Sequence, residues 1–181
     1  MSATADRLQA GLAAIRTSPA DAGTVELIVR RPAVEEREVV EEAELDATDG
    51  LVGDNWRARG SARMEDGSAN PKAQLTLMNA RLAELVAGER ERWALAGDQL
   101  YVDLDLSRAN LPPGTRLAVG SAVIEVTDEP HTGCAKFSAR FGSDALRFIN
   151  SSEGRLLNLR GINAQVVEPG SVRRGDPIRK D

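Results

Sequence analysis

The C-terminal stretch RGINAQVVEPGSVRRGDPI, residues 160–178, is the part of the sequence that decides the fold class. From Ile162 to Val166 apolar residues alternate with polar ones, which is the period of a half-buried strand. Pro169-Gly170 then interrupts the alternation as a turn, and a second short apolar segment ends at Ile178. This order of strand, turn and returning segment is typical of an antiparallel sheet.

Short segments with the same period of two recur upstream and predict further strands. They lie at 25–29, 39–45, 73–77, 116–119 and 122–127, and residues 97–106 are also expected to be extended. The segments at 116–119 and 122–127 surround Gly120-Ser121 and predict a hairpin.

Three helices are expected beside these strands, from apolar residues at helical spacing. They are an N-terminal helix within residues 1–19, a helix after Asn79 that ends at Gly88, and a helix over 138–150. Because the helices do not alternate regularly with the strands, a parallel βαβ sheet is disfavoured. We therefore predict a β-rich α+β fold, mostly β with peripheral helices, in which a mostly antiparallel sheet curls into a barrel.

Length and composition predict one soluble domain over residues 1–181. The chain has 41% hydrophobic and 28% charged residues, and no apolar run approaches the roughly 20 residues that cross a bilayer. Charged residues interrupt the first 16 positions where a signal peptide would be apolar. We therefore expect no membrane association and a cytoplasmic location.

Charge and cysteine content exclude two classes of binding site. A formal net charge of −5 argues against a general nucleic-acid binder, which needs excess Lys and Arg to neutralise phosphates. The chain has one cysteine, Cys134, and one histidine, His131, too few for an all-protein zinc site or an intrachain disulfide. Cys134 is therefore expected to be a free thiol.

The segment from Thr48 to Pro71, residues 48–71, is a long irregular loop rich in Gly, Asp, Asn, Ser and Arg. Loops of this length are usually functional or mobile, so it is a candidate wall of a site. Asp54 and Arg57 lie in it, and arginine suits the paired binding of phosphate or carboxylate. A solvated charged loop is the alternative.

Residues 129–137, EPHTGCAKF, form a loop that contains the only cysteine. A free cysteine is often a small buried hydrophobe, but His131 and Lys136 lie close to Cys134 in sequence, and cationic neighbours favour thiolate chemistry. His131 either carries a proton or only holds the loop. Arg160, before Gly161, either reaches the same cleft or pairs with a carboxylate.

These segments together resemble the MOSC domain family, named after the C-terminal part of molybdenum cofactor sulfurase. Residues 130–137 are similar to its cysteine segment of proline, cysteine and lysine, and residues 160–178 to its closing R-G-[IYV]-x-A-x-V, G-x-[IV] and G-D-x-[IV]. Residues 50–56 resemble its G-x-x-G-D-x-H stretch, with Trp56 in place of histidine. Residues 97–100 resemble its G-E-N-L, with Gln99 in place of asparagine.

The resemblance implies a cleft for the molybdenum-pterin cofactor, in which Cys134 receives sulfur or ligates molybdenum. Cys134 and His131 are then the expected catalytic residues. The residues expected to hold the cofactor are Asp54, Arg57, Lys136 and Arg160. Pyridoxal phosphate on Lys136 is disfavoured, because nothing else in the sequence supplies that site.

The resemblance leaves the activity open between a molybdenum-dependent oxidoreductase, which in some relatives reduces N-hydroxylated compounds, and a sulfurtransferase. Either would require a sulfur donor or an electron-transfer protein in trans. A non-catalytic module that binds a small anion or metabolite, and a thiol redox sensor, are the alternatives. The sequence does not predict the oligomeric state.

Overall fold

A closed β-barrel forms the centre of the structure, a computed structural model that describes residues 3–181. Its seven strands follow the order β11-β7-β8-β9-β5-β6-β1, and pairing of β1 with β11 closes the ring. The strands are β1 (Ala22–Arg30), β5 (Leu75–Asn79), β6 (Leu100–Asp103), β7 (Arg116–Val119), β8 (Ala122–Val126), β9 (Ile162–Glu168) and β11 (Pro177–Lys180). Neighbours are antiparallel except β5 and β6, which are parallel. The predicted β-rich, barrel-like fold is confirmed.

A small second sheet lies against the barrel. It contains β10 (Gly170–Arg173), β3 (Glu42–Asp46) and β4 (Gly50–Leu51), while β2 (Glu38–Val40) extends the barrel sheet beside β1. The single strand predicted over 39–45 is therefore wrong. Glu41 separates its two halves, and its carbonyl accepts a hydrogen bond from Arg174 at 2.9 Å, so the chain changes sheets there.

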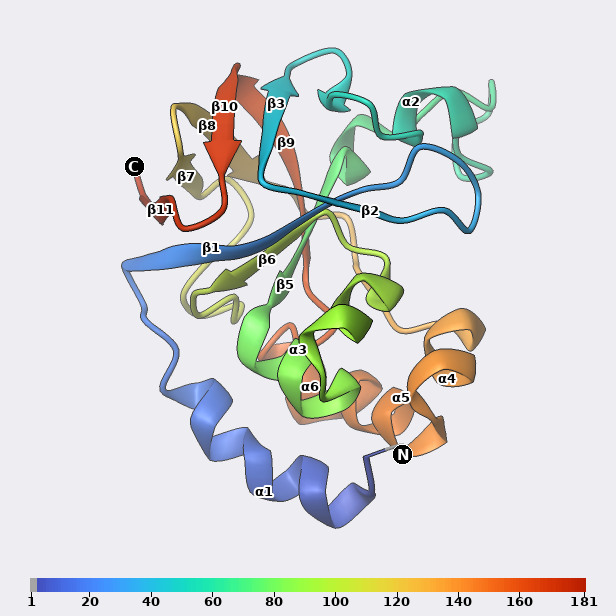
Figure 1. The fold of residues 1–181 in the computed structure, drawn as a ribbon, viewed down its shortest axis with the longest axis vertical. Coiled ribbons are helices and arrows are strands. Elements are labelled where there is room, and N and C mark those ends of the chain that lie inside the picture. Colours follow the sequence, from blue (N-terminus) through green and yellow to red (C-terminus); the bar gives the residue numbers. More distant parts are fainter. Residues whose placement is uncertain (1–2) are drawn as a thin grey trace.

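Most of the helices gather on one side of the barrel, and α2 lies apart from them (Figure 1). The helices are α1 (Ala5–Arg16), α2 (Trp56–Arg59), α3 (Ala80–Ala87), α4 (Ala135–Phe141), α5 (Ser143–Asn150) and α6 (Ser152–Leu156), with 3₁₀ turns η1 (Pro71–Ala73) and η2 (Arg90–Ala96). None of the helices in residues 3–181 is long and apolar enough to cross a membrane.

Local sequence signals place two of the helices correctly. In α1 three apolar residues at helical spacing, Leu8, Leu12 and Ile15, are buried, as the expected N-terminal helix requires. The Asn79 side chain accepts hydrogen bonds from the backbone N–H groups of Arg81 and Leu82 in the first turn of α3, and Gly88 follows the end of this helix. The strand expected to start at Ala73 instead begins at Leu75, because Pro71–Ala73 form a 3₁₀ turn.

The single helix predicted over 138–150 is wrong, and so is the expectation of only three helices. Gly142 has φ 97°, which ends α4 and starts α5, and Ala135 already begins α4. Residues 1 and 2 of the predicted N-terminal segment lie outside the described residues.

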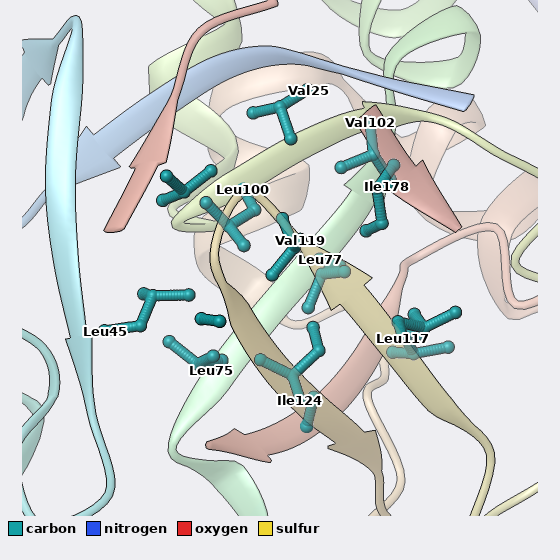
Figure 2. Close-up of a cluster of buried hydrophobic side chains, with 14 of the residues drawn as sticks. Val25, Leu45, Leu75, Leu77, Leu100, Val102, Leu117, Val119, Ile124 and Ile178 are labelled. Carbon is teal, nitrogen blue, oxygen red and sulfur yellow. The ribbon is translucent and has the colours of Figure 1, made fainter. Parts of the chain in front are cut away.

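Apolar side chains fill the barrel, and a second core lies between the barrel and the helices. Leu75, Leu77, Leu100 and Ile124 belong to the first and gather between the strands in Figure 2. Phe137 belongs to the second core, together with Phe141. Full burial of such a side chain contributes about 1.5–3 kcal/mol, so this face fixes α4 and hence the loop that precedes it.

Candidate functional site

A buried carboxylate, Asp98, connects the cysteine segment to the turn before β9. Asp98 lies between η2 and β6, and its side chain is completely buried. Its Oδ2 accepts a hydrogen bond from Nη1 of Arg160 at 2.5 Å, and its Oδ1 lies 2.9 Å from Nε2 of His131. Nη2 of Arg160 also donates to the carbonyl of Ala96 at 2.9 Å. Three segments distant in sequence therefore meet in one charged cluster.

Electrostatics fixes the protonation states of this cluster. Burial favours a neutral carboxyl group, but the charge of Arg160, the charge that His131 gains in acid and the hydrogen bonds from both outweigh it and lower the pKa of Asp98 to about 2. Burial, together with Arg160, lowers the pKa of His131, although Asp98 opposes this shift. Asp98 is thus a carboxylate and His131 is neutral at neutral pH. A carboxylate only accepts hydrogen bonds, so the proton of His131 lies on Nε2 and Nδ1 keeps its lone pair.

Gly161 allows this cluster to form against the barrel. Its φ is +118°, which a residue with a side chain rarely adopts, and an added Cβ would lie 2.2 Å from the carbonyl oxygen of Leu77. The same Cβ would lie 3.1 Å from Cδ2 of His131. The Arg160-Gly161 pair therefore has two roles: the arginine enters the cluster, and the glycine permits close approach to β5 and His131.

Asp54 forms a second buried ion pair, with Arg31 at the end of β1. Its two oxygens lie 2.8 Å from Nε and 2.7 Å from Nη2 of Arg31, and the backbone N–H of Arg31 also donates to Oδ1. Nη1 of Arg31 donates to the carbonyl of Gly97 at 3.0 Å, next to Asp98. Gln99 adds a bond of 3.3 Å from Nε2 to Asp54. Asp54 is thus connected to the Asp98 cluster through Arg31.

A small, basic cavity of about 290 Å³ opens beside this pair of clusters. Its arginines are Arg31, Arg59, Arg63 and Arg160, and His131 also lines it. Carboxylates partner three of these arginines: Asp54, Glu129 and Asp98. Arg59 has no ion pair within residues 3–181, so the cavity keeps a net positive charge that suits an anion.

A larger cavity of about 500 Å³ lies along the same segment. The residues that line both cavities are Glu129, Pro130, His131, Thr132, Arg160 and Asn163. The cysteine segment and the start of β9 thus form the wall that the two cavities share.

Cys134 lies next to this wall and is exposed to solvent. It directly precedes α4, and its side chain makes no capping hydrogen bond. The Asn150 side chain holds the preceding residue from both sides, since Oδ1 accepts from the N–H of Gly133 at 3.0 Å and Nδ2 donates to its carbonyl at 3.2 Å. Cys134 lines neither cavity, whereas Thr132, two residues earlier, lines both.

The structure brings some of the sequence-predicted residues together and leaves others outside. His131 and Arg160 line both cavities, and Asp54 reaches the smaller one through Arg31. Arg57 instead pairs with exposed Asp49 at 2.6 Å. Lys136 pairs with Glu35 at 2.9 Å, and neither Arg57 nor Lys136 lines a cavity described above. Trp56, at the position where the family usually has a histidine, is buried, and its backbone N–H donates to Oδ2 of Asp54.

Sequence reasoning missed Asp98, Arg31 and Asn150. The signal for Asp98 was its place in Gly97-Asp98-Gln99-Leu100, a stretch singled out for its pattern without a role for the acidic residue. Arg31 and Asn150 carry no local signal. Within residues 3–181 no three His, Cys, Asp or Glu side chains are grouped to hold a metal ion.

The fold and site define a β-barrel domain with a buried charged cluster beside an exposed cysteine. Residues 66–179 match the model of the MOSC domain, so the chain belongs to the MOSC domain family. MOSC domains are associated with proteins related to the molybdenum cofactor.

Several solved structures share this fold. The YuaD protein from Bacillus subtilis has a TM-score of 0.62 at 19% identity, with 87% of this chain and 94% of that chain covered. YiiM from Escherichia coli has a TM-score of 0.56 at 20% identity, with 87% and 69% covered. YiiM from Geobacillus stearothermophilus has a TM-score of 0.53 at 13% identity, with 88% and 73% covered. No curated protein sequence matches the chain.

Proposed function

We propose that this protein binds the molybdenum cofactor, or carries sulfur for it, through Cys134. The observation that supports this function best is the position of the thiol: Cys134 is exposed three residues after His131, which lines both cavities. A thiol that exchanges sulfur or binds a metal has to be reachable, and its thiolate form is the soft ligand.

The smaller cavity fits the anionic part of such a cofactor. Arg31, Arg59 and Arg160 line it, and Nε of Arg160 is buried without a hydrogen-bond partner in the described chain. A buried donor without a partner is costly, and a phosphate oxygen would satisfy it. When bound, the cofactor would supply the redox chemistry of molybdenum.

The residues around the smaller cavity then have separate roles. Arg59 and Arg160 bind the anion, and Asp54 positions Arg31 through its paired hydrogen bonds. Nδ1 of His131 accepts a proton, because Asp98 keeps the other ring nitrogen protonated. We leave Arg57 and Lys136 out of the proposed site, since both are engaged by exposed carboxylates.

Sulfur transfer, the other branch of the proposal, needs a donor protein. The Cys134 thiolate attacks the terminal sulfur of a donor persulfide, the donor's S–S bond breaks, a new S–S bond forms on Cys134, and the donor leaves as a thiolate. No net oxidation occurs. The oxidoreductase branch needs an electron donor in trans instead. A reduced cysteine of this kind suits the cytoplasm.

A second candidate function is a non-catalytic module for a small anion. The observation that favours it is that Cys134 lines neither of the two cavities. In that case the thiol would be dispensable and the arginines would not.

Measurements on a single purified sample distinguish these functions. The whole chain is purified from a molybdenum-competent host, and its molybdenum and oxidised-pterin fluorescence are measured together with Cys134 persulfide after incubation with a persulfide donor. Bound pterin supports the cofactor branch, and persulfide without pterin supports the sulfur-carrier branch. Anion binding with neither would contradict the proposal and support the second candidate. Arg59→Gln should lower cofactor content, and Arg7→Gln, an exposed arginine on α1, is the matched control.

A further inference from the structure

The larger cavity has the size and walls of a small-molecule site. Its volume of about 500 Å³ falls within the range of ligand pockets, roughly 300–1,000 Å³. Leu111, Pro113, Val126 and Ile162 supply much of an apolar lining. A ligand with an apolar body would bury that body against these side chains.

Two arginines give this apolar cavity an unbalanced positive charge. The acidic residues on its wall are already neutralised, since Asp128 pairs with Lys72 at 2.7 Å and Glu129 pairs with Arg63. Asp98 likewise neutralises Arg160. By contrast, Arg108 and Arg155 line the cavity with no ion pair or side-chain hydrogen bond within residues 3–181.

These two arginines come from neighbouring backbone segments. The N–H of Arg108 donates to the carbonyl of Leu156 at 3.0 Å, directly beside Arg155. Two arginine side chains that leave neighbouring backbone segments can reach one anionic oxygen group, and each guanidinium presents several N–H donors in a fixed plane.

The wall that the two cavities share also supplies a hydrogen-bond acceptor, Nδ1 of His131. His131 lines the cavity, Nε2 is committed to Asp98, and Nδ1 takes no hydrogen bond from the described part of the chain. The Nδ1 lone pair is therefore available to an O–H or N–H group of a ligand.

We propose that this cavity binds a small amphiphilic anion: an apolar body, an anionic oxygen group held by Arg108 and Arg155, and an O–H or N–H donor to Nδ1 of His131. The site goes beyond the function proposed for Cys134: it shares His131 with that function but uses neither the thiol nor Arg59. It follows from the charge balance and apolar lining of this one cavity.

The test uses para-hydroxybenzoate as the probe, titrated into the whole chain by calorimetry and by NMR. We expect saturable binding, weakened about tenfold or more by Arg108→Gln and by Arg155→Gln, because each removes a charged hydrogen bond. Arg7→Gln, an exposed arginine outside the cavity, is the matched control and should leave binding unchanged. Phenyl phosphate should also bind, and its comparison with benzoate, which likewise lacks the para hydroxyl, shows which anionic group the arginines prefer.

Three further probes test the remaining features of the site. Para-hydroxybenzyl alcohol lacks the charge, benzoate lacks the donor hydroxyl, and inorganic phosphate lacks the apolar body, so each should bind more weakly. Equal binding of the alcohol, of benzoate or of inorganic phosphate, equal weakening by Arg7→Gln, or no saturable binding of either aromatic anion would overturn the proposal. Cys134→Ser should bind para-hydroxybenzoate normally, which separates this result from any failure of the thiol function.

Discussion

The fold holds the two ends of the segment from His131 to Cys134 in opposite ways. His131 is 17% exposed and is bonded to a completely buried carboxylate, whereas Cys134 is exposed and its side chain caps nothing. Between them Asn150 holds Gly133 through two hydrogen bonds. Buried charges thus orient the His131 end of the segment, whereas the thiol at the Cys134 end is open to a partner.

The largest expected effect is at the buried end. Asp98→Ala should lower the free energy of unfolding by about 3–5 kcal/mol, because it leaves the buried charge of Arg160 without its partner. Chemical denaturation measures this loss. Glu35→Ala is the matched control at the exposed end, since Glu35 also pairs with two cations, Lys136 and Arg140, but in solvent. Equal losses for the two variants would contradict the contrast between the ends.

The next largest effect is expected for Gly161→Ala. Backbone strain alone should lower the free energy of unfolding by about 1–3 kcal/mol, and the clash with Leu77 should lower it further. The variant should also displace His131 and raise its pKa toward the ordinary value as burial is lost. Gly114→Ala is the control, because Gly114 has φ +92° with nothing near its Cβ position. If Gly161→Ala and Gly114→Ala lower the free energy of unfolding equally, the close approach of the backbone at Gly161 does not explain the need for glycine there.

Acid should destabilise the protein through the same cluster. The pKa of Asp98 is about 2 in the folded state, against an ordinary value of 3.8. The contribution of Asp98 to the free energy of unfolding is therefore complete above pH 3.8 and disappears as the pH falls toward 2. That shift corresponds to stability on the order of 2 kcal/mol. His131 also has a lowered pKa, so it adds a loss of the same sign as the pH falls below 6.5.

Denaturation curves across this pH range measure both losses. NMR of the only histidine should give a midpoint below 6.5, and a midpoint at or above that value would contradict the neutral His131.

The smallest effect on stability is expected at Cys134. Cys134→Ser should change the free energy of unfolding by no more than about 0.5 kcal/mol, because the side chain is exposed and makes no capping bond. The native protein should also react with iodoacetamide nearly as fast as the unfolded chain. Slow labelling that needs unfolding would show that the thiol is protected.

Local patterns in the sequence predicted the parts of the fold that depend on local structure. The alternation after Ile162 and the hairpin around Gly120-Ser121 became β9 and the β7–β8 pair. The prediction over 39–45 failed because the change of sheets at Glu41 depends on Arg174, far along the chain. The helix over 138–150 was predicted as one because its apolar spacing continues through Gly142.

The candidate site was predictable only where single residues carried a signal. His131 and Arg160 were chosen from their motifs, and both line the cavities. Asp98 lies 33 positions from His131 and 62 from Arg160, so only closure of the barrel reveals that one carboxylate serves both. Arg57 and Lys136 were grouped with the site because they are near Asp54 and Cys134 in sequence, but exposed carboxylates hold them elsewhere.

The most direct test of the central claim compares wild type with Cys134→Ser, both purified from a molybdenum-competent host. Molybdenum, pterin and sulfur bound as persulfide are measured on the same preparations, together with the melting temperature. Wild type should carry cofactor or accept sulfur, and the serine variant should melt at the same temperature and do neither. A serine variant that retains what wild type carries, or a wild type that carries neither, would contradict the assignment of this chemistry to Cys134.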